Sequence, residues 1–64
     1  MSIFSIGDKV VLTAAMKRAA IEPEKYESGT VEYVWSLGVV DVKWNGIDHP
    51  ISMRNDEVEK EVQA

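Results

Sequence analysis

The sequence predicts an all-β protein, a small five-stranded barrel, and three observations support this prediction. Five short segments alternate apolar and polar residues with the period of two that is typical of half-buried strands. Residues typical of turns separate the later segments, whereas one longer connection follows the first of them. The 64 residues suffice for one domain, and a closed five-stranded sheet can be stable at this length where an isolated hairpin cannot.

The first strand is predicted at residues 9–13, KVVLT. Val10 and Leu12 fall on its apolar face, which should be buried. Phe4 and Ile6 are expected to lead into the same core. The core is therefore expected to begin close to the first residues of the chain.

The long connection that follows is expected to contain two helical turns. Residues 14–20 are rich in good helix formers, and the hydroxyl of Thr13 can cap their N-terminal end. Ile21 would then pack inward. Proline suits the first position of a helix, so Pro23 predicts one further turn over residues 23–26.

The second strand is predicted at residues 29–35, GTVEYVW. Alternation places three residues on the face expected to be buried, namely Val31, Tyr33 and Trp35. The opposite face carries Thr30, Glu32 and Val34. Residues 36–38 are expected to make the turn into the third strand.

The third strand is predicted within residues 38–46, GVVDVKWNG. One face carries Val40, Val42 and Trp44, and the other carries Val39, Asp41 and Lys43. One side of this strand is thus expected to pack into the core while the other meets solvent. Asn45-Gly46 predicts a tight hairpin turn, because both residues tolerate positive φ.

The last part of the chain predicts two more strands with a turn between them. Residues 49–53 are expected to form the fourth strand, and Pro50, which has no N–H, should lie at its start or at a sheet edge. Residues 54–57 predict a helical or 3-10 turn, and residues 58–62 the fifth strand. The side chains expected on one face are His49, Ile51 and Met53, followed by Val58 and Val62 pointing inward.

The composition narrows the classes of function. The chain has no cysteine, which excludes disulfides and thiolate metal sites, and we expect no cofactor. Its N-terminus lacks the pattern of a signal peptide, and no segment is long and apolar enough to cross a bilayer. A cytoplasmic protein without membrane association is therefore expected. The formal net charge of −4 disfavours non-specific binding to nucleic acid.

Four stretches follow patterns that recur together in one superfamily. They read GDKVVL, GTVEYV, VDVKWNG and DEVEKEV, at residues 7–12, 29–34, 40–46 and 56–62. Together they resemble the SH3-like barrel superfamily, in particular its KOW and Tudor-like branches. The resemblance covers nearly the whole chain and implies the fold. Such barrels bind proteins, RNA or peptides, so the fold alone does not select a function.

A weaker resemblance concerns one family of enzymes. FSIGDKV, SGTVEYVW and the His49-Pro50 pair are similar to segments of the plasmid-encoded type II dihydrofolate reductases, which are tetrameric SH3-like barrels. That family lines its catalytic pore with a Val-Gln-Ile-Tyr run after the His-Pro step. Residues 51–54 read ISMR here and lack the Gln and the Tyr, so this activity is not expected.

No other catalytic or metal-binding pattern is evident. His49 could act as a base oriented by Asp48, but neighbouring residues of a strand point to opposite faces, which should separate their side chains. One histidine with dispersed carboxylates has no recognisable metal-ligand spacing. We therefore expect neither catalysis nor a metal site.

Binding of another protein is the leading hypothesis. The candidate contact residues are Tyr26, Trp35, Leu37 and Trp44, because loop ends form the recognition groove of many SH3-like barrels and exposed aromatics anchor partners. Core packing is the competing interpretation for Trp44 and Tyr33, whereas Trp35 lies at the strand end and is expected to be partly exposed. The module could be an accessory protein of the kind that phages and mobile elements encode, acting on a host factor.

Two other interpretations stay open. A KOW-like domain that binds nucleic acid, such as structured RNA, would need its cations to gather in space, and the best candidates are Lys17, Arg18, Lys25 and Arg54. Self-association into a homo-oligomer would use exposed strand edges or the outward apolar residues Leu37, Val11 and Val39.

Overall fold

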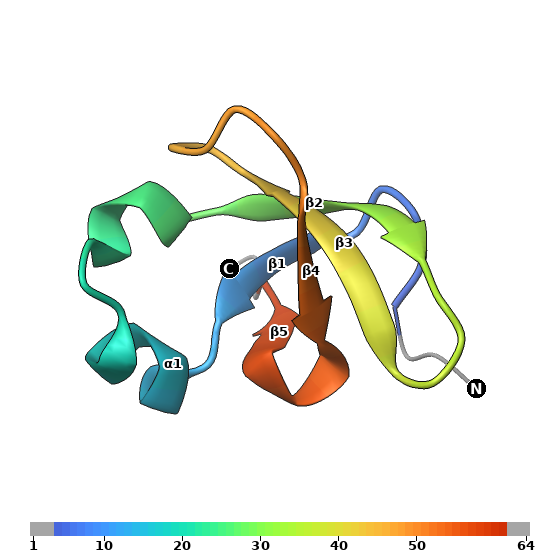
Figure 1. The fold of residues 1–64 in the computed structure, drawn as a ribbon, viewed down its shortest axis with the longest axis horizontal. Helices are drawn as coiled ribbons and strands as arrows, with labels where there is room; N and C mark the ends of the chain where they lie inside the picture. The colour runs from blue at the N-terminus through green and yellow to red at the C-terminus, as the bar shows by residue number, and fades with distance from the viewer. Residues whose placement is uncertain (1–3, 62–64) are drawn as a thin grey trace.

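The structure, a computed structural model, describes residues 4–61 and contains one antiparallel sheet of five strands (Figure 1). The strands are β1 (Lys9–Leu12), β2 (Gly29–Val34), β3 (Val39–Trp44), β4 (Ile51–Arg54) and β5 (Val58–Lys60). Helix α1 (Ala14–Ala19) and the 3-10 turn η1 (Pro23–Tyr26) connect β1 to β2, and the 3-10 turn η2 (Asn55–Glu57) connects β4 to β5. The predicted all-β class and its five strands are confirmed.

The strand order β4-β3-β2-β1-β5 gives the sheet its two edges, β4 and β5. Strand β1 lies at a central position, because it pairs with β2 on one side and with β5 on the other. Strands β2 and β3 form a hairpin, and β4 continues the meander. Figure 1 shows that the long connection with α1 and η1 lies beyond the end of the β2–β3 hairpin at which β2 begins.

The two helical turns of the long connection begin where the sequence predicts. The Thr13 hydroxyl accepts a hydrogen bond from the Met16 amide at 3.4 Å, and Pro23 takes the first position of η1. The expectation that Ile21 packs inward is wrong, since its side chain is 97% exposed. The chain is already extended at Ala20 (φ −73°, ψ 138°), so Ile21 lies after the helix. The direction of its side chain therefore does not follow the helical repeat of α1.

The core lies on the inner face of the sheet and is centred on Trp44, which has no exposed surface. Its other buried members are Phe4, Val10, Leu12, Val31, Val40, Val42, Met53 and Val58. Phe4 is buried as expected, but Ile6 is 66% exposed, which corrects its predicted place in the core. Gly7 (φ +96°) turns the chain directly after Ile6, and its amide binds the Val31 carbonyl at 2.8 Å.

A bulge in β2 changes which residues of this strand face outward. Pairing with β3 is regular up to Val31, then shifts so that Tyr33 pairs with Asp41 and Val34 with Val40. Val34 therefore packs on the core, whereas Tyr33 is 48% exposed. The predicted alternation, with Tyr33 on the buried face and Val34 opposite, is wrong beyond Val31, because one extra residue inverts it. The expected partial exposure of Trp35 at the strand end is confirmed, since this residue is 51% exposed.

The tight turn with positive φ lies at the opposite end of β3 from the one predicted. Leu37 (φ 69°) and Gly38 (φ 76°) both adopt the left-handed conformation in the β2–β3 turn. No such backbone is found at Asn45 or Gly46, where the Ile47 amide instead binds the Trp44 carbonyl at 3.2 Å. A six-residue connection then leads to β4, so His49 lies in a loop and is exposed. Val62 lies outside the described residues.

Candidate functional site

The four candidate contact residues lie at two ends of the β2–β3 pair. Tyr26 contacts Trp44 edge to face, with ring centroids 5.6 Å apart, and Trp44 pairs with the first residue of β2. Trp35 and Leu37 follow the last residue of β2, at the hairpin turn. The structure thus brings Tyr26 to Trp44 and places Trp35 near Leu37 in the chain, but it separates these two pairs, which lie at the Gly29 end and beyond the Val34 end of β2.

Trp44 cannot contact a partner in this structure. Its side chain is fully buried, and its indole Nε1 has no hydrogen-bond partner among the described residues. The edge-to-face contact with Tyr26 instead fixes η1 against the end of β3. Of the two interpretations of Trp44, the structure supports core packing.

An exposed apolar surface lies at the β2–β3 turn. We call Tyr33, Trp35 and Leu37 the hairpin surface; their side chains are 48%, 51% and 97% exposed. The rings of Tyr33 and Trp35 meet edge to face with centroids 4.6 Å apart. Each aromatic residue therefore restricts the other, which presents a preformed pair of rings to solvent.

Sequence reasoning missed Tyr33 because alternation from Val31 places it inside. The bulge that turns it outward leaves Glu32 exposed as well, and Tyr33 pairs with Asp41 on β3. The Asp41 carboxylate accepts a hydrogen bond from the Ser52 hydroxyl at 2.7 Å. Two carboxylates thus accompany the aromatic pair. No simple sequence pattern would have located the extra residue.

A shallow depression adjoins the hairpin surface. Leu37 and Gly38 line one side of it, and residues 54–56 line the other. The Asn55 amide binds the Gly38 carbonyl at 2.8 Å, which ties the hairpin turn to η2. The hairpin surface therefore stands on a turn that is fixed to the rest of the protein by a backbone hydrogen bond.

A second apolar feature lies at the other end of the β2–β3 pair. A groove of about 510 Å³ separates α1 and η1 from β4. Its apolar walls include Leu12, Met16, Ala20, Tyr26, Ile51 and Met53. Ile21, although 97% exposed, borders the same groove. We call this feature the helix groove.

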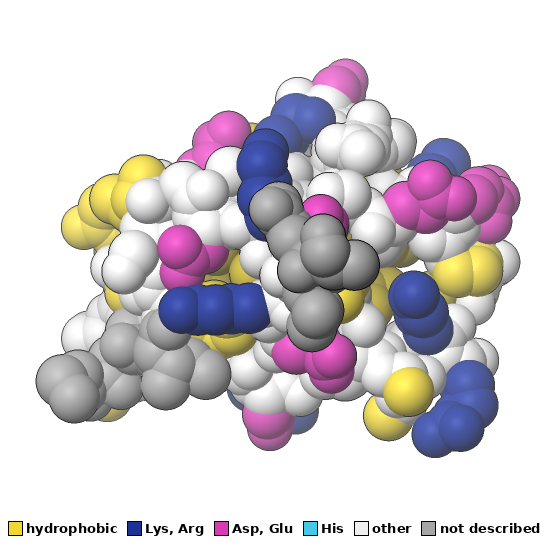
Figure 2. Space-filling view, turned by 180° about the vertical axis from the view of Figure 1, so that it is seen from behind, with side chains coloured by type: hydrophobic (Ala, Val, Ile, Leu, Met, Phe, Trp, Pro, Cys, Tyr) yellow, Lys and Arg dark blue, Asp and Glu magenta, His cyan; other side chains and the backbone are white. Residues whose placement is uncertain are grey.

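The candidate cations for nucleic-acid binding do not form one free basic patch. Lys17 and Arg18 are exposed on α1, but Lys25 binds Glu22 at 3.0 Å and Arg54 lies 3.4 Å from Asp56. Lys25 and Arg54 also lie at opposite ends of β3, because Lys25 contacts Gly46 while Arg54 pairs with Val39. On the face drawn in Figure 2, basic and acidic side chains are interspersed.

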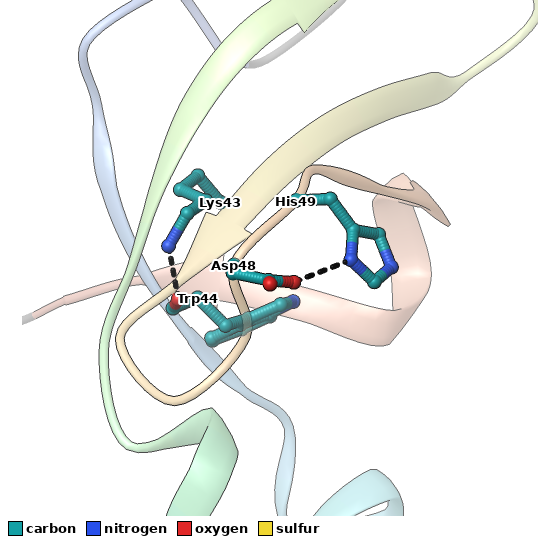
Figure 3. A network of polar contacts seen from close by, with 4 residues as sticks. All are labelled: Lys43, Trp44, Asp48 and His49. Carbon is teal, nitrogen blue, oxygen red and sulfur yellow. Dashed lines mark hydrogen bonds and ion pairs between the residues drawn. The ribbon is translucent and has the colours of Figure 1, made fainter.

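Asp48 and His49 lie closer together than expected. Because both lie in the loop after β3, their side chains can turn toward one another, and His49 Nδ1 lies 3.0 Å from Asp48 Oδ1 (Figure 3). The hydrogen bond with His49, followed by its charge, lowers the pKa of the Asp48 carboxyl. The expectation that strand geometry separates them is wrong.

This pair offers no built reaction centre. The His49 and Asp48 side chains are 69% and 100% exposed, so water surrounds both. The nearby Lys43 ammonium donates instead to the Trp44 carbonyl at 2.9 Å (Figure 3). Within residues 4–61, no group of three or more His, Asp or Glu side chains could hold a metal ion.

Comparisons with protein-family models, with curated proteins and with solved structures found no match. In the described part of the chain, no helix has both the length and the apolar character needed to cross a membrane.

Proposed function

We propose that this chain is a small SH3-like barrel that binds another protein through the hairpin surface. Closure of the sheet into a barrel is supported by the connection between its two edges. In a flat sheet, β4 and β5 would lie roughly 19 Å apart, at about 4.8 Å per strand. The three residues of η2 join them, and the four Cα–Cα steps from Arg54 to Val58 can span only about 14 Å when extended, which favours a curled sheet.

The outward direction of Tyr33 and Trp35 is the observation that carries the proposed function. A regular strand would bury Tyr33 beside Val31, and the bulge exposes it next to Trp35 instead. Bulges often redirect side chains at functional sites. Tyrosine and tryptophan are also the residue types that contribute most binding energy at protein interfaces.

The backbone of Leu37 supports the same surface. A leucine with φ 69° adopts a conformation that costs about 1–2 kcal/mol relative to a right-handed one. The side chain held there is 97% exposed, so it gains almost no packing energy in the isolated protein. Strained residues cluster at sites that bind ligands or switch conformation, which supports a contact role for Leu37.

The charge around the hairpin surface favours a protein partner over nucleic acid. Glu32 and Asp41 flank the aromatic pair and would repel phosphate groups. The same carboxylates suit a partner with basic side chains beside its apolar contact. Two of the four candidate phosphate-binding cations, Lys25 and Arg54, are already held by carboxylates.

Capture from a native cell lysate at moderate salt, with and without nuclease, tests this proposal. We expect a stoichiometric protein that survives nuclease treatment. Trp35→Ala and Tyr33→Ala should each weaken its binding by tenfold or more, since truncation of an anchor residue typically costs about 2 kcal/mol. Ile21→Ala, which truncates an exposed apolar residue at the helix groove, should leave the affinity of a single site unchanged.

Two outcomes would contradict the proposal. Captured material that disappears with nuclease would identify nucleic acid as the partner. Retention of full affinity in both aromatic variants, with far-UV circular dichroism showing an intact fold, would place the recognition site elsewhere.

A further inference from the structure

We propose that Asn45 is a site of non-enzymatic deamidation and that the docking of η1 on Gly46 controls the rate of this reaction. The site lies in the turn after β3 and goes beyond partner binding by the hairpin surface. Its neighbour Trp44 pairs with the first residue of β2, whereas Trp35 follows the last. The two proposals can therefore be tested separately.

The Asn45-Gly46 dipeptide has the groups that deamidation requires. Hydroxide removes the proton of the Gly46 amide, and the nitrogen then attacks Cγ of the Asn45 side chain. A C–N bond forms while the side-chain nitrogen takes a proton from water and leaves as ammonia. Water opens the resulting cyclic succinimide at one of its two carbonyls, which gives aspartate or isoaspartate. Asn45 is exposed, and Gly46 has no side chain to hinder the attack, so both reactants can reach the site.

The packing of η1 requires a glycine at position 46. A Cβ atom there would lie 2.6 Å from Lys25 Cα and 2.9 Å from Lys25 Cβ. The backbone of Gly46 thus packs directly against η1, and a side chain would prevent this contact. The same glycine therefore allows η1 to dock and leaves Asn45 open to attack by the next residue.

The docked η1 holds the nitrogen that would attack. The Gly46 amide donates a hydrogen bond to the Lys25 carbonyl at 3.1 Å, and the Asn45 amide donates to the Ser28 carbonyl at 2.9 Å. While the first hydrogen bond is in place, hydroxide does not reach the Gly46 proton and the nitrogen cannot turn toward Cγ. The rate in the folded chain is then the rate in the open state multiplied by the fraction of molecules in which η1 has opened.

The contact between Tyr26 and Trp44 stabilises the docked state. Their rings meet edge to face with centroids 5.6 Å apart, and Trp44 is fully buried, so the last residue of η1 is fixed to the core. The turn itself has four residues and no side-chain cap, and 3-10 hydrogen bonds have poor geometry. Loss of the Tyr26 ring should therefore increase the fraction of molecules with a free Gly46 amide.

Formation of isoaspartate should make the opening permanent. It adds one carbon atom to the backbone between the amides of residues 45 and 46. These two amides bind carbonyls of one short segment, those of Ser28 and Lys25. The changed spacing should break at least one of the two hydrogen bonds, which would release η1 from the end of β3.

Incubation at mildly alkaline pH, followed by digestion and liquid chromatography with mass spectrometry, tests this inference. We expect Asn45 to deamidate faster in guanidinium chloride than in the folded chain. The other asparagine, Asn55, precedes Asp56, whose side chain hinders the attack, so it should remain largely intact in both conditions. This residue is an internal reference for every sample.

A matched pair of variants tests the role of η1. Tyr26→Ala should raise the rate at Asn45 at least about twofold, which corresponds to the loss of one aromatic contact. Tyr33→Ala is the control, because its ring also makes an edge-to-face contact, with Trp35 at the hairpin surface. It should leave the rate at Asn45 unchanged.

Asn45→Asp separates the added charge from the longer backbone. This variant carries the charge of the product with an ordinary backbone, and the side chain at position 45 is exposed, so its unfolding midpoint should stay close to that of the unaltered chain. The isoaspartyl chain, isolated by chromatography, should unfold at a lower midpoint. This comparison decides the inference even where Tyr26→Ala fails to fold.

Three results would overturn the inference. The first is a rate at Asn45 that is no higher in guanidinium chloride than in the folded chain. The second is a Tyr26→Ala variant with an intact fold by circular dichroism that deamidates no faster than Tyr33→Ala. The third is an isoaspartyl chain that is as stable as Asn45→Asp. None of these results bears on partner binding by Trp35, so the two proposals can fail separately.

Discussion

Gly29 lies directly against the indole of Trp44. A Cβ atom at Gly29 would come within 2.8 Å of Trp44 Cε3 and 2.5 Å of Val42 Cγ1. Trp44 is fully buried and contacts Tyr26 on η1, so its ring has no room to retreat. The absence of a side chain at the first position of β2 is therefore what allows the largest core residue to pack against this strand.

Gly29→Ala should consequently destabilise the protein by about 2–3 kcal/mol, which is the cost of overpacking a rigid core. Urea unfolding followed by fluorescence measures this change. Thr30→Ala serves as the control, because Thr30 is only partly buried and its hydroxyl binds the exposed Lys9 ammonium at 2.9 Å. It should cost less than about 1 kcal/mol. Equal effects of the two substitutions would contradict the role of Gly29.

Deletion of Glu32 should be tolerated. The pairs Val31–Val42, Tyr33–Asp41 and Val34–Val40 become a regular ladder once the extra residue is removed. Each remaining side chain then keeps its present face. We expect a folded protein whose near-UV circular dichroism and unfolding midpoint stay close to those of the unaltered chain.

Deletion of Asp41, in β3, is the matched comparison for this experiment. No compensating extra residue is found in the pairing of β3 with β4, so the deletion should move Val40 or Val42 off the core face and unfold the protein. If deletion of Glu32 were equally damaging, the bulge would be essential to the fold and not an insertion within it.

The sequence predicts the secondary-structure elements of this fold better than it predicts which side chains are buried and which are exposed. Strand positions follow from alternation, and the cap at Thr13 and the turn at Pro23 follow from local hydrogen bonding and fixed φ. The exposure of Tyr33 depends on a pairing between two strands, which a single-strand pattern does not contain. The approach of His49 to Asp48 was missed because β4 begins two residues after His49.

The prediction of a hairpin turn with positive φ at residues 45–46 failed for a related reason. Asn45-Gly46 is a strong signal for a hairpin with positive φ. In this structure the Gly46 amide instead binds the Lys25 carbonyl at 3.1 Å, which connects this turn to η1. The turn predicted at residues 36–38 is confirmed, but leucine is a poor choice for a left-handed position, so the positive φ of Leu37 has no local signature. Contacts between distant segments decide both cases.

Leu37→Gly should stabilise the isolated protein by about 0.5–1 kcal/mol. Glycine adopts φ 69° without steric cost, and the leucine side chain that is lost is almost entirely exposed. Gly38→Ala should have the opposite effect and cost about 1 kcal/mol, since φ is 76° there. Thermal unfolding of the two variants measures both changes, and a destabilised Leu37→Gly would mean that this side chain packs in the folded state.

The Asp48 carboxyl should titrate below its ordinary pKa of 3.8, because it forms a hydrogen bond with His49 and feels its charge. A pKa lowered in the folded state stabilises the fold above the unfolded value, and this contribution disappears as the pH falls through the folded value. Since both side chains are exposed, the change in stability is small and NMR titration is the suitable measurement. His49→Ala should bring the Asp48 pKa back up.

The pKa of Lys25 is shifted in the opposite direction to that of Asp48, and the same NMR titration can measure it. Its hydrogen bond and charge interaction with Glu22 raise its pKa above 10.5, so its contribution is complete below that value and disappears as the pH rises through the folded pKa. Glu22→Gln should lower the Lys25 pKa and leave that of Asp48 unchanged. A common shift of both groups would indicate a change of structure in place of two local pairs.

The positions of the helix groove and the hairpin surface at opposite ends of the β2–β3 pair have a consequence for how the chain can be immobilised. Because the sequence has no cysteine, Ile21→Cys would provide one unique thiol for attachment. Ile21 is 97% exposed and borders the helix groove, whose wall residue Tyr26 contacts Trp44 opposite Gly29, whereas Trp35 follows the Val34 end of β2. A chain held by that thiol would therefore keep the hairpin surface accessible.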